Sequence, residues 1–466
     1  MINLNFAPNE TFSDALTSFL LLFQPWRWER GEELEKIKNI ILTRYLNVSR
    51  FMFHVTLFLS GRSALYHLLK NLNLKEGDEV LVQAFTCEAV VVPIVALKLK
   101  PVFVDIEKQS FSINPIDLEK KLSKKSKVVI LQHTFGITPS QREKILSIIR
   151  KHNLVLIEDI AHGINISKIK MQNAKLKNHF YLLSFGRSKS LSSVFGGAIV
   201  TNNKTIAKKL DSLNLSYPSY SLIFKLLLYK PIVFLIKLTY NIYLGRPIHF
   251  FAQKFNLLIP EITKKERAGE YDTLFDKKYP NALAILLLNQ LKRFKKIQNQ
   301  RKKMVNFYLK TIIGLGYQNL SINFMSNLPA YQQKNFNIPM SSRTSFGISN
   351  EMLKQVQHDK KFKKHIDLNI SPQFSLIRFP LLIKNRDKIL QNLAKKGIFL
   401  GRWYDSPVAP KGFPLDKVGY RWGSCPKAEE ICQKIINLPT NNIKLNEAEK
   451  LTKILNDVIY ENQNHK

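Results

Sequence analysis

The chain has 466 residues, of which 45% are hydrophobic and 23% charged, which excludes a disordered protein and allows two or three domains. Lysine and arginine number 71 against 35 aspartates and glutamates, and the resulting formal charge of +36 favours anionic partners. The lysines are scattered and no nucleic-acid-binding motif accompanies them, so we expect no nucleic-acid partner.

Cysteine usage and the first residues bear on the compartment. Cys87, Cys425 and Cys432 form no CxxC pair and no metal-ligand spacing. We therefore expect no disulfide framework and no metal site, and a reducing, cytoplasmic environment. The apolar stretch from Ala15 to Phe23 follows acidic residues instead of a basic segment, so it does not resemble a signal peptide. The sequence shows no uninterrupted apolar run of about 18 residues, so no simple transmembrane span is expected.

Residues 1–58 are predicted to form an N-terminal arm, and from residue 59 short apolar strands alternate with helices. Strands separated by helices, each strand apolar along nearly its whole length, indicate a mostly parallel sheet with helices on both faces. The predicted fold class is therefore α/β, with residues 59–305 forming a three-layer αβα large domain. The expected strands are Glu79–Gln83, Pro101–Asp105, Lys127–Gln132, Leu154–Glu158 and Phe180–Leu183, and the helices are Ala64–Leu72 and Gln141–His152.

An apolar insert interrupts this domain at residues 219–258. Pro231 should end or kink a helix, so two short helices are predicted. One interpretation is a basic segment lying peripherally on the inner face of a membrane. The other, which we favour, is a lid or dimer-covering insert whose lysines lie at its rim.

The remaining chain is predicted to form one long helix and a smaller domain. Asn281–Lys303 has the pattern of a single helix. Residues 306–466 are predicted to form a C-terminal α+β domain that contains an irregular insert at 326–374. Its expected elements are a strand at Arg378–Leu382 and helices at Arg386–Lys396 and Asn446–Tyr460.

Three residues in the large domain have side chains or backbones suited to cofactor chemistry. Gly61 allows a tight turn before a helix whose first amides can bind a phosphate. Asp159 ends an apolar strand, where α/β sheets bind ligands, and its carboxylate can keep a pyridinium nitrogen protonated. Lys189 can form a Schiff base with an aldehyde and later move a proton. Their order and placement predict pyridoxal phosphate as cofactor.

The motifs around these residues resemble a known family. Ser60–Ala64, Glu158–His162, Ser184–Lys189 and Gly196–Gly197 follow one another as in the DegT/DnrJ/EryC1/StrS aminotransferases. These are pyridoxal-phosphate enzymes of fold type I that mostly aminate keto-sugar nucleotides. The resemblance is strong from Ser60 to about Asn203 and returns at Pro280–Arg293 and Cys425–Glu430.

The resemblance implies a role for each motif residue. Lys189 matches the lysine that holds the cofactor, Asp159 matches the carboxylate that pairs with the pyridine nitrogen, and His162 stands near the ring hydroxyl. The cofactor phosphate would be bound by Gly61, Arg62, Ser63 and Ser184.

Some positions depart from the family pattern. Cys87 stands where an aromatic residue commonly stacks on the cofactor ring, so stacking must come from elsewhere. Asp276 stands where an asparagine usually reaches the partner subunit's cofactor phosphate, and a second anion there would be unfavourable. The Gly-Asp pair that usually precedes the Phe180 strand is missing.

The expected function is amino transfer to a keto-sugar nucleotide in glycan or cell-surface polysaccharide biosynthesis, with glutamate as donor and a homodimer as the working form. Arg402, Trp403 and Tyr404 are candidate substrate contacts. One alternative is a sugar dehydratase, although the dehydratases of this family carry histidine where this chain has Lys189. The other is a catalytically degenerate scaffold or regulatory protein associated with a membrane.

Overall fold

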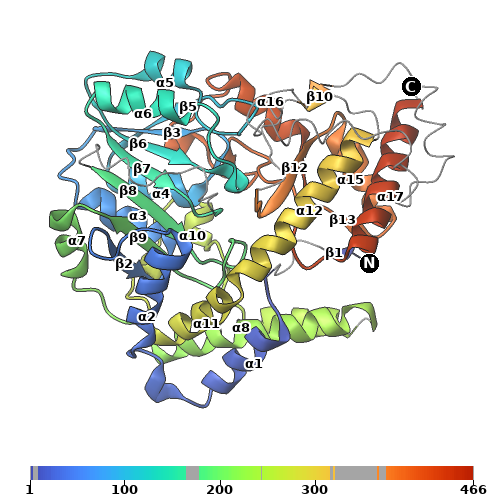
Figure 1. The fold of residues 1–466 in the computed structure, drawn as a ribbon, viewed down its shortest axis with the longest axis horizontal. Helices are drawn as coiled ribbons and strands as arrows, with labels where there is room; N and C mark the ends of the chain where they lie inside the picture. Colours follow the sequence, from blue (N-terminus) through green and yellow to red (C-terminus); the bar gives the residue numbers. More distant parts are fainter. Residues whose placement is uncertain are drawn as a thin grey trace, which may run out of the picture.

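The computed structural model describes residues 2–3, 9–163, 178–242, 244–314, 319–320, 365–366 and 374–464. A central sheet with helices against both faces forms the large domain, and a smaller C-terminal domain packs beside it (Figure 1). The predicted insert at 326–374 lies almost entirely outside the described residues.

Seven strands form the central sheet in the order β2-β9-β8-β7-β6-β3-β5. The run from β5 to β8 is parallel, whereas β9 is antiparallel to both of its neighbours. All five predicted strands are present to within one residue at each end, and the mostly parallel sheet is confirmed. The strands are β2 (His54–Phe58), β3 (Glu79–Gln83), β5 (Lys100–Val104), β6 (Ser126–Gln132), β7 (Val155–Asp159), β8 (His179–Ser184) and β9 (Gly197–Thr201).

Strand β2 belongs to this sheet and not to an N-terminal arm. It pairs antiparallel with β9, with Val55 opposite Val200. The predicted boundary at residue 58 is therefore wrong, because the partner that brings β2 into the sheet lies far along the chain.

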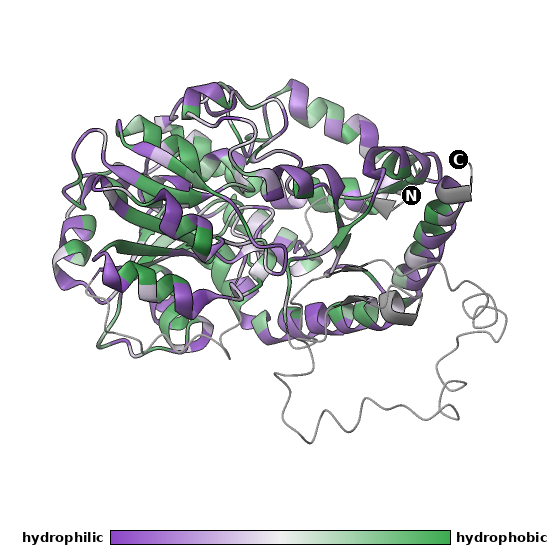
Figure 2. Ribbon diagram, turned by 90° about the horizontal axis from the view of Figure 1, so that it is seen from above, coloured by the Kyte–Doolittle hydropathy of each residue, from purple (hydrophilic) through white to green (hydrophobic). Residues whose placement is uncertain are grey.

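Alternate residues of the strands face two different helical layers, which confirms the three-layer arrangement. Val80 and Val82 of β3 lie in the core with α3 (Gly61–Lys70) and α4 (Glu88–Ala96). Leu81 between them lies in a separate core with α5 (Pro115–Lys121) and α6 (Arg142–Lys151). The strands form a mainly hydrophobic centre with polar helix faces outside (Figure 2).

Helix α8 (Tyr220–Thr239) is continuous through Pro231, so the predicted pair of short helices is wrong. Proline has no N–H to donate to the carbonyl of Leu227, one turn earlier. The hydroxyl of Ser18, on α1 (Phe12–Leu21), donates to that carbonyl at 2.7 Å. Packing against α1 thus supplies the missing hydrogen bond. No helix in the described part of the chain is long and apolar enough to span a membrane.

The predicted long helix after residue 280 is two helices, α11 (Asn281–Lys292) and α12 (Phe294–Gly314). They meet at Arg293, whose guanidinium donates to the Asp14 carboxylate of α1 at 2.6 Å. The other elements of this part of the large domain are α2 (Glu33–Ile40), α7 (Lys204–Asp211), α9 (Gly245–Lys254) and α10 (Lys264–Arg267).

Helix α12 extends from the large domain toward the small one, where α15 and α17 lie (Figure 1). Strand β12 matches its prediction and pairs antiparallel with β15. The small domain comprises β12 (Arg378–Leu382), α15 (Arg386–Lys395), β13 (Ile398–Phe399), β14 (Val408–Ala409), α16 (Pro426–Lys434), β15 (Ile435–Pro439) and α17 (Leu445–Asn464). Short β1 (Ile2–Asn3) pairs with β13.

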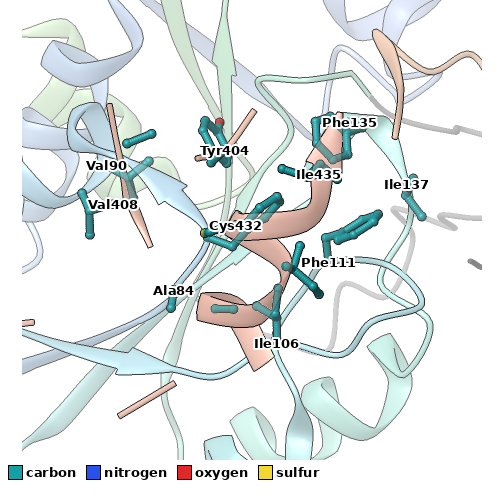
Figure 3. Packing of buried hydrophobic residues seen from close by; sticks show 14 of the residues in the cluster. Ala84, Val90, Ile106, Phe111, Phe135, Ile137, Tyr404, Val408, Cys432 and Ile435 are labelled. Carbon is teal, nitrogen blue, oxygen red and sulfur yellow. The ribbon is translucent and has the colours of Figure 1, made fainter. Parts of the chain in front are cut away.

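The two domains share one hydrophobic core. Cys432 and Ile435 of the small domain lie among Ile106, Phe111 and Phe135 of the large domain (Figure 3). Strand β14 also pairs with β4 (Thr86–Cys87) beside the sheet. The small domain therefore lies directly beside Cys87, one of the predicted site residues.

Candidate active site

A cavity of about 380 Å³ lies at the carboxyl ends of the parallel strands, between the two domains. Pockets of about 300–1,000 Å³ are typical for small ligands. Of the eight predicted site residues, Ser63 is not among those that line the cavity. The other seven predicted residues do line it: Gly61, Arg62, Cys87, Asp159, His162, Ser184 and Lys189.

Asp159 is the last residue of β7, and two hydrogen bonds orient its carboxylate. Gln132, which ends the neighbouring strand β6, donates its side-chain Nε2 to Oδ2 at 2.9 Å. The main-chain N–H of Ala161 donates to Oδ1 at 3.0 Å. A carboxylate can accept further bonds, so these two fix Asp159 while it still lines the cavity.

Glu158, the neighbour of Asp159 on β7, is fully buried on the other face. Its carboxylate accepts from Arg142 at 2.5 Å and contacts His133 at 2.7 Å and His179 at 2.9 Å. Burial alone would raise the pKa of this carboxyl group, but the hydrogen bonds and charges of the two histidines hold it well below its usual value. These contacts hold the Glu158 side chain on one face of the strand, so Asp159, the next residue, points to the opposite face.

Lys189 lies in the loop that follows β8 and faces an aromatic wall. Its Nζ lies 5.7 Å from the centre of the Trp403 ring. The His162 ring stacks on Trp403 at 5.4 Å with an angle of 21° between the planes. Trp403 and Tyr404, expected only as substrate contacts, thus contribute flat surfaces beside the lysine.

His162 is neutral and its two ring nitrogens are both engaged. Nδ1 accepts from the main-chain N–H of Phe135 at 3.2 Å, and Nε2 lies 3.2 Å from the Tyr404 hydroxyl. Because Nδ1 accepts, the proton of the neutral ring is on Nε2. Burial, with the nearby charges of Lys189 and Arg378, lowers the pKa of His162 well below its usual value.

One corner of the cavity lies where α3 begins beside the end of β8. A side chain at Gly61 would place its Cβ 3.1 Å from Cβ of Ser184, and one at Gly197 would lie 2.5 Å from Cα of Gly61. Only glycines permit this approach, which brings the start of α3 next to the Ser184 hydroxyl. The main-chain N–H of Ser63 already donates to the Ser60 hydroxyl at 3.1 Å, so the amides of Gly61 and Arg62 and the Ser184 hydroxyl are the groups here that suit a phosphate.

The two other residues predicted at this corner have partners in the chain itself. The Arg62 guanidinium pairs with Glu266 and donates to the main-chain oxygen of Glu261 at 2.6 Å. The Ser63 hydroxyl donates to Asp276 at 2.8 Å, and Asp276 also contacts His67. Burial would raise the pKa of Asp276, but the bonds from His67 and Ser63 lower it.

Cys87 and Glu88 form the edge of the cavity where α4 begins. Burial, with the neighbouring Glu88 charge, raises the pKa of the Cys87 thiol to about 12, so it stays protonated. Burial also raises the pKa of Glu88 to about 7, although Arg62 opposes this. Cys87 offers no aromatic surface, so the flat surfaces of the cavity are those of His162, Phe195, Trp403 and Tyr404.

Sequence reasoning missed several residues that line the cavity, among them the polar residues Gln132, Glu88 and Glu261. Gln132 ends a predicted strand, and this placement, the same one that indicated Asp159, could have revealed it. Glu88 directly follows Cys87, but its burial depends on tertiary packing. Glu261 accepts from Ser188 at 2.8 Å and follows the insert, where no motif marked it. Arg402, a predicted contact, does line the cavity.

The arrangement fits pyridoxal phosphate. The corner at Gly61 and Ser184 accommodates the phosphate, and the Asp159 carboxylate suits a protonated ring nitrogen. Lys189 lines the same cavity as Asp159. The fold and site thus define an α/β protein with one cavity, at the carboxyl ends of its strands, that is lined by both a lysine and a carboxylate.

The chain belongs to the DegT/DnrJ/EryC1/StrS aminotransferase family, whose model matches residues 27–217 and 341–458. It is 29% identical over 181 residues to GDP-perosamine synthase of Escherichia coli O157:H7, covering 39% of this chain and 48% of that one. It is 31% identical over 155 residues to a UDP-N-acetyl-3-dehydro-alpha-D-glucosamine 3-aminotransferase of Acidithiobacillus ferrooxidans, covering 33% and 42%. The chain thus spans less than half the length of these relatives.

Solved structures show the same fold. NtdA of Bacillus subtilis, solved with bound PMP, superimposes with a TM-score of 0.65 at 19% identity, covering 99% of this chain and 85% of that one. GDP-4-keto-6-deoxy-D-mannose-3-dehydratase of E. coli, with hydrated PLP, gives 0.63 at 15% identity, covering 98% and 100%. At these identities the likeness concerns the fold and not the reaction.

Proposed function

We propose that this chain is a pyridoxal-phosphate-dependent aminotransferase that moves an amino group, from glutamate, to a keto-sugar nucleotide in glycan or cell-surface polysaccharide biosynthesis. The observation that carries this proposal is that Lys189 and Asp159 line one cavity beside a phosphate-binding corner. The family and the 3-dehydro sugar named for one relative support the substrate class.

Each residue then has a defined task. When bound, pyridoxal phosphate supplies an aldehyde for amines and a ring that accepts electrons from the adjacent carbon. Lys189 would hold the cofactor through its aldehyde group, and its freed amine would carry the proton during the transfer. Asp159 keeps the ring nitrogen protonated, and the amides at the start of α3 with Ser184 hold the phosphate. Trp403 and Tyr404 restrict water on one side of the cavity.

The test uses the purified full chain loaded with pyridoxal phosphate. A visible absorption band of the lysine-bound cofactor should appear, and adding glutamate should abolish it while 2-oxoglutarate forms. A Lys189→Ala variant should show neither change. A band that persists with glutamate would favour the scaffold alternative instead. Asp276 is one motive for that alternative, but its carboxylate has partners within the chain, since it accepts from the Ser63 hydroxyl and contacts the His67 ring.

The dehydratase alternative shares the fold, since one structural neighbour is titled as a dehydratase. The presence of Lys189 in the cavity favours amino transfer, because a lysine amine can hold and release the cofactor during each transfer. Product analysis distinguishes the two reactions. Amino transfer yields an amino sugar and 2-oxoglutarate in equal amounts, whereas dehydration yields a deoxy product.

We also propose a homodimer as the working form, which light scattering of the loaded protein tests. The chain's position in the cell and a peripheral contact of residues 219–258 with an inner-membrane surface stay predictions. Helix α8 in this segment packs on α1 and buries Ile223, Leu226 and Leu227, which supports the covering role instead. Sedimentation with anionic vesicles would reveal a membrane contact.

A further inference from the structure

The loop that carries Lys189 is held by parts of the chain that lie outside the family-matched segments. The match covers residues 27–217 and 341–458. Asn9, Glu10 and Lys230 all lie outside these ranges, yet all three contact the loop between β8 and β9. The N-terminal residues and helix α8 therefore do more than cover the large domain.

Asn9 contacts the main chain of the lysine itself. Its side-chain Nδ2 donates to the main-chain oxygen of Lys189 at 2.5 Å. Its Oδ1 accepts from Arg301 at 2.8 Å and from Asn441 at 3.0 Å. Asn9 is only 2% exposed, so both ends of its amide are fixed without competition from water.

Glu10 and Lys230 form a buried ion pair at the other end of the same loop. Lys230 Nζ lies 2.6 Å from the Glu10 carboxylate, and neither side chain is more than 1% exposed. The same Nζ donates to the main-chain oxygen of Ser192 at 3.1 Å, and the Ser192 hydroxyl donates to Glu10 at 3.4 Å. Removing either partner of a buried ion pair leaves an uncompensated charge and is strongly destabilising. The two side chains therefore stay paired, and their hydrogen bonds with Ser192 fix its position.

Two further contacts, one from α12 and one from α8, support the loop that carries Lys189. The Arg301 guanidinium, which donates to Oδ1 of Asn9, also donates to the main-chain oxygen of Ser190 at 3.0 Å. The Arg187 guanidinium lies 4.1 Å from the centre of the Tyr229 ring on α8. The loop is thus fixed on both sides of Lys189 and at the lysine itself.

We propose that Asn9 and the Glu10–Lys230 pair are positioning residues that hold the 188–193 loop so that the Lys189 amine enters the cavity at the angle the cofactor requires. This inference rests on the proposed function. The insert helix α8 is then part of the catalytic framework, because it supplies Lys230. Asn9 is the sharper probe, since it touches the lysine main chain directly.

The decisive variant is Asn9→Asp. A carboxylate beside Arg301 forms an ion pair, so the fold is retained, but the donor to the Lys189 oxygen is lost. Glu10→Gln combined with Lys230→Met removes both charges together, which avoids leaving one buried charge alone. Ser18→Ala is the matched control: it removes a different contact of α8, the hydrogen bond from α1 to Leu227, without touching the loop.

Each protein is loaded with pyridoxal phosphate, and visible-region circular dichroism reports the orientation of the bound chromophore. Thermal unfolding without cofactor reports the fold. We expect Asn9→Asp and the double variant to lose at least about half of the visible dichroism and to retain the cofactor about tenfold less tightly, equivalent to one hydrogen bond. Ser18→Ala should keep the wild-type dichroism even if its unfolding temperature falls.

Two outcomes would overturn the inference in different ways. Wild-type dichroism and cofactor affinity in Asn9→Asp would show that the loop needs no such support, with the proposed function intact. A wild-type chain that forms no cofactor band at all would remove the proposed function and, with it, this inference.

Discussion

Replacing Asp159 with asparagine tests the role of the carboxylate with little cost to the fold. The Ala161 N–H can donate to the oxygen of the new amide as it does to Oδ1. The new NH₂ group would face Gln132, whose Nε2 now donates there at 2.9 Å. Gln132 Oε1 is buried and has no hydrogen-bond partner among the residues that the structure describes, so the Gln132 amide can turn and accept instead. We therefore expect a small change in unfolding temperature.

The functional loss should be much larger. A charge-assisted hydrogen bond is worth about 1.5–3 kcal/mol and a neutral one about 0.5–1.5 kcal/mol. The difference of roughly 1–2 kcal/mol predicts cofactor binding about 5- to 30-fold weaker in Asp159→Asn. The rate should fall more, by about 100-fold or greater, because proton transfer at carbon depends on the electron-accepting ring.

Steady-state kinetics with glutamate and single-turnover absorbance measurements supply the assay. The loss should appear in kcat, with a smaller change in KM. N-methylated pyridoxal phosphate carries a fixed positive charge on the ring nitrogen. Compared with the ordinary cofactor, it should therefore raise the rate of Asp159→Asn and give the wild type little or no gain. A variant that keeps a third or more of the wild-type kcat would refute the assigned role of Asp159.

Three further predictions follow from the packing and the buried charges. Gly61→Ala should weaken binding of pyridoxal phosphate about tenfold but leave unphosphorylated pyridoxal nearly unaffected, because the new methyl group meets Ser184 at 3.1 Å; equal losses would contradict a phosphate corner. Since burial raises the pKa of Glu88 to about 7, the stability of the wild type falls as pH rises from the ordinary value of 4.5 to 7. Glu88→Gln should therefore be more stable than the wild type by roughly 3 kcal/mol at about pH 8 and equal to it at about pH 4, which denaturant titration checks. Glu158→Gln should destabilise the fold by about 3–5 kcal/mol in urea, because Arg142 loses its buried counter-charge; a loss below about 1 kcal/mol would show that the pair is not buried in solution.

The sheet could be predicted from the sequence because its strands are short, apolar along their length and bounded by helices. The place of Asp159 and Lys189 at the cavity could be predicted too, since Asp159 ends a strand and Lys189 follows one at the edge where ligands bind. Strand β2 was missed because its partner β9 lies far away in the sequence. A local pattern does not reveal an antiparallel partner of this kind.

The errors in the helices have equally specific causes. Pro231 predicts a break, but the Ser18 hydroxyl donates to the carbonyl that proline leaves without a donor, and that contact is invisible locally. Arg293 ends α11 where the pattern predicts continuity, and its side chain is bound there by Asp14, a residue far away in the sequence. The support of the lysine loop by Asn9 was likewise beyond sequence reasoning, since the two residues are 180 positions apart.

The attachment point of the cofactor is the most direct test of the account. The full chain is loaded with pyridoxal phosphate, reduced with borohydride, digested and examined by mass spectrometry. The account predicts one modified peptide, with the reduced phosphopyridoxyl group on Lys189, and no label when glutamate is added before the reduction. A label on any other lysine, or none while the cofactor stays bound, would contradict it.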